Sequence, residues 1–581
     1  MKNLIVPFLF FLFTAMNAQT NIVVTNPEAD AILKGNYNPE EYMPTNVINK
    51  PAEILQGINN DASASSLHDY IVELVSFENR NTGSDTISSE RGIGAARRKV
   101  YQMFQEFSMK NNNRLIPFYL QFDQSICGMS QHRNIAAVLP GNNVANHSII
   151  IVEGHIDSRC ETGCDTQCDA HGAEDNASGT ALVIELARIM SQYSYNQTIV
   201  FVCTIGEEQG LFGANAFAKY CKDNNINVKA VFNNDVVGGI YCGSSSSPPP
   251  CPFEGHIDST QLRMFAQSGD SRQLSRFVKL EYEEELKEKV SVPMDLSIMS
   301  VEDRTGRGGD HIPFRMKGYA SMRFTSANEN GSANSSDPQY DGHQHSARDI
   351  LGVDTDGDNV IDSFFVDFNY LARNTVVNGM AASLAALGPQ TPIFYGEEDG
   401  NKLIISIEDE LDYNHYRIFS RSTEEDFDSI YDLVGSKSMS IERISNPTSL
   451  QKVSIASVDE NGIESLFSRE QAYFPFTTNV KEVVIDGVQS SQIAKITSIW
   501  PNPFNDFTTI GFLVMDQSII KDLEILITDS FGRKIRSSNF KPLYGYNEIR
   551  FNRDNMSSGI YNLSLIINGY ITESTMLVIG G

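Results

Sequence analysis

The stretch Ser-Ile-Ile-Ile-Val-Glu-Gly-His-Ile-Asp at residues 148–157 runs from a short apolar segment into an imidazole and a carboxylate. The β-branched segment at 148–153 predicts a buried strand. The same order returns twice: an apolar segment at 199–204 precedes Gly-Glu-Glu at 206–208, and another at 230–233 precedes Asn-Asp. Three predicted strands therefore end in side chains that can bind a cation or move a proton.

The chain around these strands alternates between strand and helix patterns. Further strands are predicted at 134–139 and 320–325, and helices near 67–77, 92–107, 179–193 and 211–222. Such alternation with apolar strands indicates an α/β domain, which we place at 63–388, with a mostly parallel sheet flanked by helices. An Ala-rich helix near 368–387 ends this domain.

The polar strand ends are expected to meet on one rim, because ligands of open α/β sheets gather outside the carboxyl ends of the strands. Another acidic residue, in Gly-Ala-Glu-Asp-Asn-Ala-Ser-Gly at 172–179, joins them from the turn before a helix. Mixed imidazole and carboxylate ligands suit zinc, and a convergent rim suits two metal ions about 3.5–4 Å apart. The residues concerned are His155, Asp157, Asp175, Glu207, Glu208 and Asp235.

Two later motifs complete a recognisable set: Gly-Asp-His-Ile-Pro-Phe at 309–314 and Gln-His-Ser-Ala-Arg-Asp at 344–349. Together with the strand-end motifs, they resemble the secreted two-zinc aminopeptidases, whose relatives include glutamate carboxypeptidases and glutaminyl cyclases. The resemblance covers roughly residues 63–388. It implies a zinc-peptidase fold, two zinc ions and hydrolysis of peptide or protein substrates, most simply as an aminopeptidase.

The resemblance also implies the role of each metal ligand. Asp175 would bridge both zinc ions, His155 and Asp235 would complete one site, and Glu208 and His345 the other. His345 is preferred to the neighbouring His343 because an Asp stands four residues after it, as in the family's His-Thr-x-x-Asp pattern.

The remaining roles concern catalysis and the substrate pocket. Glu207 would be the general base, and the Asp157 carboxylate would hydrogen-bond the far nitrogen of His155 and fix its tautomer. His311 is expected to line the pocket or to be structural rather than to bind metal. Glu329 is a candidate to receive a free N-terminus.

Other chemistries have less support in the sequence. It contains no Gly-x-Ser-x-Gly elbow and no His-Glu-x-x-His helix, which argues against a serine hydrolase and a single-zinc protease of that type. The alternatives are a glutamate carboxypeptidase-like hydrolase, a single-zinc glutaminyl cyclase, and a binding module without activity. A second Glu-Gly-His-Ile-Asp-Ser, at 254–259, follows a Pro-rich run and is expected to be a loop.

A second ion site is predicted from closely spaced carboxylates. Hard oxygen ligands converging on a tight turn suit calcium, and the loop resembles thrombospondin type 3-like loops. The alternative is a polar turn without an ion. The residues are Asp354, Asp356, Asp358 and Asp362.

The two ends of the chain indicate export. Residues 1–18 read as a signal peptide, and 19–62 as a leader or an N-terminal arm. Residues 389–480 resemble a fibronectin type III-like module through Ser-Ile-Ala-Ser-Val-Asp-Glu-Asn-Gly-Ile-Glu-Ser at 454–465. Residues 490–581 resemble the C-terminal sorting domain of type IX secretion, through Trp-Pro-Asn-Pro-Phe and Ser-Gly-Ile-Tyr. We expect two β-sandwich-like domains, the type IX machinery as a partner, and a secreted or cell-surface protein.

Charge and cysteine usage narrow the partners and the compartment. The net charge of −28 argues against nucleic acid, which requires a basic surface. We expect no transmembrane segment in the mature protein. Disulfides are expected among Cys160, Cys164 and Cys168 and between Cys242 and Cys251, with a Cys-only zinc site as the alternative.

Overall fold

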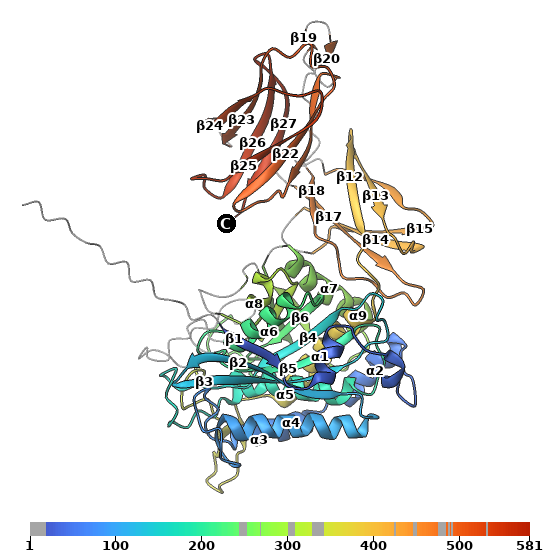
Figure 1. Cartoon of the computed structure of the whole chain (residues 1–581). Helices are drawn as coiled ribbons and strands as arrows, with labels where there is room; N and C mark the ends of the chain where they lie inside the picture. The colour runs from blue at the N-terminus through green and yellow to red at the C-terminus, as the bar shows by residue number, and fades with distance from the viewer. Residues whose placement is uncertain are drawn as a thin grey trace, which may run out of the picture. The chain divides into compact units, whose positions relative to one another are not determined.

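The computed structural model describes residues 19–580, with gaps at 243–251, 268, 300–301, 303–307, 328–341, 423–425, 445–449, 474–483, 486–487, 490–491 and 530–532. Chain contacts define two compact units (Figure 1). The first comprises Met1–Pro392 with Asp409–Arg417 and Ile455–Arg469. The second comprises Ile393–Glu408, Ile418–Ser454 and Glu470–Gly581.

The first unit is built on a nine-stranded sheet with the order β1-β2-β3-β5-β4-β6-β9-β7-β8. The strands are β1 (Thr20–Val24), β2 (Ile116–Ile126), β3 (Met129–Leu139), β4 (Ile149–His155), β5 (Thr198–Thr204), β6 (Val228–Asn234), β7 (Gln261–Phe265), β8 (Asp295–Ile298) and β9 (Ser321–Ser326). All five predicted strands are present, as β3, β4, β5, β6 and β9.

The sheet is mixed, which corrects the prediction of a mostly parallel sheet. Its centre, β5-β4-β6-β9, is parallel, whereas β1, β2 and β3 run antiparallel up to β5 and β7 runs antiparallel to β9. The missed strand β2 alternates buried and half-buried residues over most of its length. It joins β3 through a tight turn in which Cys127 and Gly128 have φ of 48° and 83°, so no crossover helix is needed.

Helices flank this sheet on both faces (Figure 1). Residues of β4 and β5 are all buried, as expected for central parallel strands covered by helices. The five predicted helices are present as α3 (Ala64–Val75), α4 (Gly92–Lys110), α5 (Ser178–Met190), α6 (Phe212–Asp223) and α9 (Phe368–Leu387). Two more helices of this domain, α7 (Asp270–Glu285) and α8 (His311–Met316), were not predicted.

The segment 19–62 is built into the first unit. Its strand β1 pairs with β2, α1 (Pro27–Leu33) buries Ile32 and Leu33, and α2 (Pro51–Asp61) packs against α9. The arm therefore extends the sheet edge and covers α9.

The rest of the chain is antiparallel β structure. One module has the sheets β12-β13-β16 and β15-β14-β17-β18, and the next has β21-β22-β25 and β24-β23-β26-β27. Their strands are β12 (Ile393–Asp399), β13 (Lys402–Glu408), β14 (His415–Arg421), β15 (Ser429–Val434), β16 (Ser438–Glu442), β17 (Gln451–Val458), β18 (Gln471–Tyr473), β21 (Ala494–Trp500), β22 (Phe507–Val514), β23 (Leu523–Asp529), β24 (Lys534–Phe540), β25 (Gly545–Asn552), β26 (Gly559–Ile567) and β27 (Tyr570–Ile579). The two predicted sandwich-like domains are thus present.

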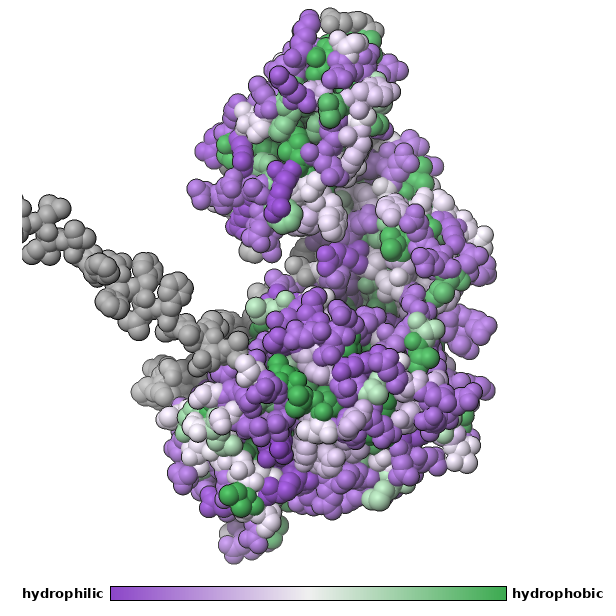
Figure 2. Space-filling model, viewed as in Figure 1, coloured by the Kyte–Doolittle hydropathy of each residue, from purple (hydrophilic) through white to green (hydrophobic). Residues whose placement is uncertain are grey.

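The surface in view is mainly hydrophilic, with small separate apolar patches (Figure 2). This agrees with the net charge of −28. Within the described ranges, none of the helices has both the length and the apolar composition needed to cross a bilayer.

Candidate metal centre

The predicted ligands reach one rim of the first unit from the ends of different elements. His155 is the last residue of β4, and Asp235 directly follows β6. Asp175 lies in the single turn Ala173–Ala177 that leads into α5. Glu207 and Glu208 lie between β5 and α6, and His345 lies in the loop before β10 (Gly352–Val353).

The first cluster forms around the His155 imidazole. Its Nε2 lies 3.2 Å from Asp175 Oδ1 and 3.4 Å from Asp235 Oδ1. Glu207 also belongs to this cluster, because ligand atoms of His155, Glu207 and Asp235 lie within 4.8 Å of one another.

The second cluster forms around His345. Its Nε2 lies 3.2 Å from Asp175 Oδ2 and 3.3 Å from Glu208 Oε2. Asp175 therefore presents one carboxylate oxygen to each cluster. His343 instead packs its ring edge-on against Phe365, so His345 is the imidazole that joins the cluster.

The chemistry of this rim fits a bound cation. His155 Nε2 and Glu208 Oε1 are buried without a hydrogen-bond partner. Burial raises the pKa of Glu207 and of Glu208 well above the usual carboxyl value, with nearby carboxylates adding to it. Buried carboxylates are costly unless a cation compensates them. Both clusters have the imidazole and carboxylate donors that zinc prefers.

The structure corrects the predicted contact between Asp157 and His155. His155 Nδ1 lies 3.0 Å from the backbone carbonyl of Asp157, and the nearest side-chain oxygen of Asp157 is 3.8 Å away. The carboxylate instead accepts the backbone N–H groups of Glu207 and Glu208 at 3.3 Å and the Thr82 hydroxyl at 3.1 Å. It therefore orients the loop that carries both glutamates.

Three further side chains position the ligands, and the sequence pattern had indicated only one of them, Asp349. Arg323 of β9 lies 3.2 Å from Asp235 Oδ2, and Arg159 Nε donates to Glu208 Oε2 at 2.8 Å. Asp349 accepts the backbone N–H groups of Glu174 and Asp175, both at 2.9 Å. The available signals were an arginine inside an apolar strand, which is rarely buried without a partner, and the position of Asp349 at the end of the 344–349 motif; Arg159 gave no such signal.

A buried arginine also ties the two ligand loops together. The Arg80 guanidinium donates to the carbonyls of Ile156, His171 and Gly172. These carbonyls lie next to the segments that carry His155 and Asp175. Burial lowers the pKa of Arg80 to about 10, so it remains a cation at neutral pH.

The two predicted pocket residues have different outcomes. His311 is fully buried, its Nε2 lies 3.3 Å from the Glu302 carbonyl, and burial lowers its pKa to about 3. This favours the structural alternative for His311. Glu329 lies outside the described residues.

The acidic loop 354–362 brings part of its predicted set together. Ligand atoms of Asp354, Asp356 and Asp362 lie within 4.8 Å of one another. Asp358 lies outside this group and accepts the Val360 N–H at 2.8 Å. The second His-Ile-Asp copy is a loop, as predicted, because Asp258 Oδ1 accepts the N–H groups of Thr260 and Gln261.

The cysteines form disulfides near the metal centre. Cys127 pairs with Cys164, and Cys160 with Cys168. The alternative of a Cys-only zinc site is therefore wrong for these residues. Cys203 is buried and unpaired in β5, whereas Cys251 lies outside the described residues.

Fold and site together define an α/β protein with a candidate metal centre at the carboxyl ends of its central strands. Residues 134–352 match the model of peptidase family M28. A probable zinc metalloprotease of Pyrenophora teres f. teres is 30% identical over 59% of this chain and 70% of its own length. One from Leptosphaeria maculans is 32% identical over 56% of this chain and 75% of its own. The chain belongs to peptidase family M28 and is a zinc metallopeptidase.

The chain is also similar to two solved structures, at lower sequence identity. The Legionella pneumophila LapA aminopeptidase is 16% identical, with a TM-score of 0.41 over 57% of this chain and 75% of that one. Porphyromonas gingivalis glutaminyl cyclase is 16% identical, with a TM-score of 0.35 over 55% and 97%.

The C-terminal module has its own assignment. Residues 498–579 match the secretion system C-terminal sorting domain. This confirms the predicted export signal, and the protein is secreted or displayed at the cell surface.

Proposed function

We propose that this metallopeptidase is an aminopeptidase that holds two zinc ions. The observation that carries the proposal is the Asp175 carboxylate, whose oxygens lie 3.2 Å from His155 Nε2 and 3.2 Å from His345 Nε2. His155 and Asp235 would hold one ion, Glu208 and His345 the other, and Asp175 both. Bound zinc would supply Lewis acidity and lower the pKa of a coordinated water.

In this proposal Glu207 moves the proton. It belongs to the group around His155, and its backbone N–H is held by Asp157. A carboxylate oxygen of Glu207 would take a proton from the attacking water and pass it to the leaving amine. His155 would bind metal through Nε2, because its Nδ1 faces the Asp157 carbonyl.

The choice of an aminopeptidase follows the resemblance of the motifs to the two-zinc aminopeptidases, not the charge of the rim. The four buried or nearly buried carboxylates, of Asp175, Glu207, Glu208 and Asp235, would be offset by the zinc ions and by Arg159 and Arg323. Carboxypeptidase activity and single-zinc cyclisation of Gln peptides are therefore distinguished by experiment.

The test combines zinc content with substrate choice on the chain from residue 19 onward. About two zinc ions per chain, with chelator-sensitive release of amines from aminoacyl-nitroanilides, would support the proposal. One zinc with cyclisation of N-terminal Gln peptides would favour the cyclase alternative. Cleavage of N-blocked peptides from the other end would favour a carboxypeptidase, and no metal and no turnover a binding module.

We also propose a structural calcium ion at Asp354, Asp356 and Asp362. The support is their proximity on a loop between β10 and β11 (Ser363–Phe364). Calcium should raise the midpoint of thermal unfolding of the wild-type chain, and the change should vanish in Asp354→Asn/Asp362→Asn. An equal shift in that variant would contradict the site.

The domain boundaries complete the proposal. Residues 1–18 would be removed as a signal peptide, 19–62 would stay with the peptidase domain as an arm, and 389–480 would act as a fibronectin type III-like spacer. Residues 490–581 would be removed after export by the type IX machinery. Mass spectrometry of the exported protein would test both cleavages.

A further inference from the structure

Each metal cluster contains a carboxylate that it does not share with the other cluster, Asp235 in the first and Glu208 in the second. One arginine contacts each of these carboxylates. In the first cluster, Arg323 Nη2 lies 3.2 Å from Asp235 Oδ2. In the second, Arg159 Nε donates to Glu208 Oε2 at 2.8 Å. Charge-assisted hydrogen bonds of this kind fix a carboxylate more strongly than neutral ones. Each cluster thus has an arginine that contacts one of its carboxylates, but the two arginines lie in different parts of the fold.

Arg323 lies in the core, whereas Arg159 lies in a loop. Arg323 extends from the central strand β9, and its side chain is 2% exposed. Arg159 follows the end of β4 by four residues, and its side chain is 20% exposed. No sheet pairing holds Arg159, so its position depends on the loop 159–169.

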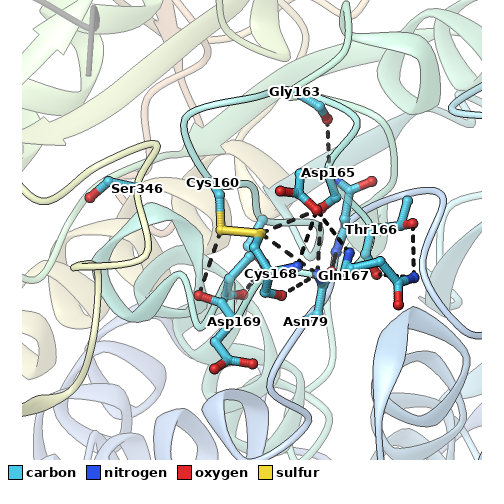
Figure 3. Close-up of a disulfide and its surroundings, with 12 residues drawn as sticks. Asn79, Cys160, Gly163, Asp165, Thr166, Gln167, Cys168, Asp169 and Ser346 are labelled. Carbon is cyan, nitrogen blue, oxygen red and sulfur yellow. Dashed lines mark hydrogen bonds between the residues drawn. A yellow bond between two sulfur atoms is a disulfide. The ribbon is translucent and has the colours of Figure 1, made fainter. Parts of the chain in front are cut away.

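Two disulfides close this loop. The Cys160–Cys168 bond spans 8 residues, and the Cys127–Cys164 bond ties the same loop to the β2–β3 turn. Figure 3 shows the first disulfide and labels Ser346, the residue after His345, in its surroundings. Arg159, at the start of the loop, and His345 both contact Glu208 Oε2, so the loop lies near the segment that supplies the imidazole of the second cluster.

Two hydrogen bonds from side chains to the loop backbone hold the loop near Arg159. The Gly163 carbonyl accepts the side-chain N–H of Asn81 at 2.9 Å and of Gln209 at 3.0 Å. A Cβ at Gly163 would lie 3.8 Å from Arg159 Nη1, so the guanidinium lies close to this point of the loop. Gln209 directly follows Glu208, which links the loop to the ligand segment a second time.

We propose that Arg159 is a positioning residue for Glu208 and that the Cys160–Cys168 disulfide holds Arg159 in place. Arg159 Nε lies 2.8 Å and His345 Nε2 3.3 Å from the same oxygen, Oε2 of Glu208, so the guanidinium fixes the oxygen that lies in the second cluster. Removing such a supporting contact typically weakens metal binding about 10–100-fold. This inference rests on the proposed two-zinc function and adds that one half of the centre depends on a disulfide.

The first test compares Arg159→Met with the matched control Arg91→Met, which breaks an exposed pair with Glu78. Zinc affinity is measured by competition with a chromogenic chelator, and kcat and KM on an aminoacyl-nitroanilide. We expect one of the two zinc ions in Arg159→Met to bind about 10–100-fold more weakly, with lower kcat at subsaturating zinc and little change in KM. Arg159→Lys should restore affinity in part, because it keeps the charge but lacks the planar fork.

The second test is Cys160→Ser/Cys168→Ser, with circular dichroism to show that the chain is folded. The same zinc ion should bind more weakly, and adding Arg159→Met should cause little further loss. Unchanged zinc affinity in Arg159→Met would overturn the proposal. A rise in KM confined to acidic peptides would also overturn it, because Arg159 would then bind substrate.

These outcomes are separable from those of the proposed function. If wild-type protein binds fewer than two zinc ions, the proposed function fails whatever Arg159 does. If it binds two and Arg159→Met binds them equally tightly, only the present inference fails.

Discussion

At the scale of single residues, Asp175 and Glu207 are expected to fail in different ways. Glu207→Gln should keep both zinc ions, because the amide still fits the pocket, but lose about 10²–10⁴-fold in kcat, the contribution typical of a general base. Asp175→Ala should lose metal as well as activity, because it removes an oxygen from each cluster. Zinc analysis and turnover on the two variants test this. Full zinc content in inactive Asp175→Ala would count against its bridging role.

Gly179 shows how close packing sets the position of a ligand. A Cβ there would lie 2.2 Å from the Asn234 carbonyl oxygen and 2.5 Å from Asn176 Oδ1. Because these atoms flank Asp235 and Asp175, Gly179→Ala should displace the start of α5, destabilise the chain by about 1–3 kcal/mol and weaken zinc binding. Urea unfolding and chelator competition measure the two effects, and normal zinc affinity would show that the backbone can relax.

At the scale of elements, α2 should matter to the stability of the first unit. Ile58 is fully buried, and a Cβ added at Gly379 of α9 would lie 2.8 Å from its Cγ2. Ile58→Ala should therefore lower the free energy of unfolding by about 2–5 kcal/mol. Glu53→Ala, on the exposed side of the same helix, should change it by less than about 0.5 kcal/mol. If Ile58→Ala changed the free energy of unfolding as little as Glu53→Ala, the arm would not be coupled to global unfolding.

The elements also show which patterns can be interpreted locally. The Ala-rich helix predicted near 368–387 is α9, because twenty residues of helical composition follow the cap of Asp367 on Tyr370 N–H. Strand β2 was missed although its residues alternate regularly. The antiparallel direction of β2 and β3 depends on the turn at Cys127 and Gly128 rather than on either strand.

At the scale of the whole molecule, the metal centre and the sorting domain should be separable. All proposed zinc ligands lie in the first unit, and residues 490–581 lie in the second. A chain that ends at residue 489 should keep its zinc content, kcat and KM, but should not be exported by cells that have the type IX machinery. Zinc analysis and kinetics test whether the metal centre is retained, and cell fractionation tests whether export is lost. Loss of zinc in a folded truncated chain would contradict this separation.

Local sequence patterns were enough to predict the chemistry of the site and the order of the domains. Apolar strands ending in His155, Glu207 with Glu208, and Asp235 are local patterns, because strand burial and ligand type depend on neighbouring residues. The family motifs and the sorting domain are local in the same sense. These features therefore required no knowledge of the fold.

The contacts that hold these residues in place depend on the folded chain. The direction of each Asp175 oxygen depends on His155 and His345, and its backbone is held by Asp349, 174 residues away. Arg159 and Glu208 are 49 residues apart, and the disulfide pairing places Arg159 beside its partner. Such contacts join elements that meet only after the chain has folded, so no periodicity or spacing in the sequence could specify them.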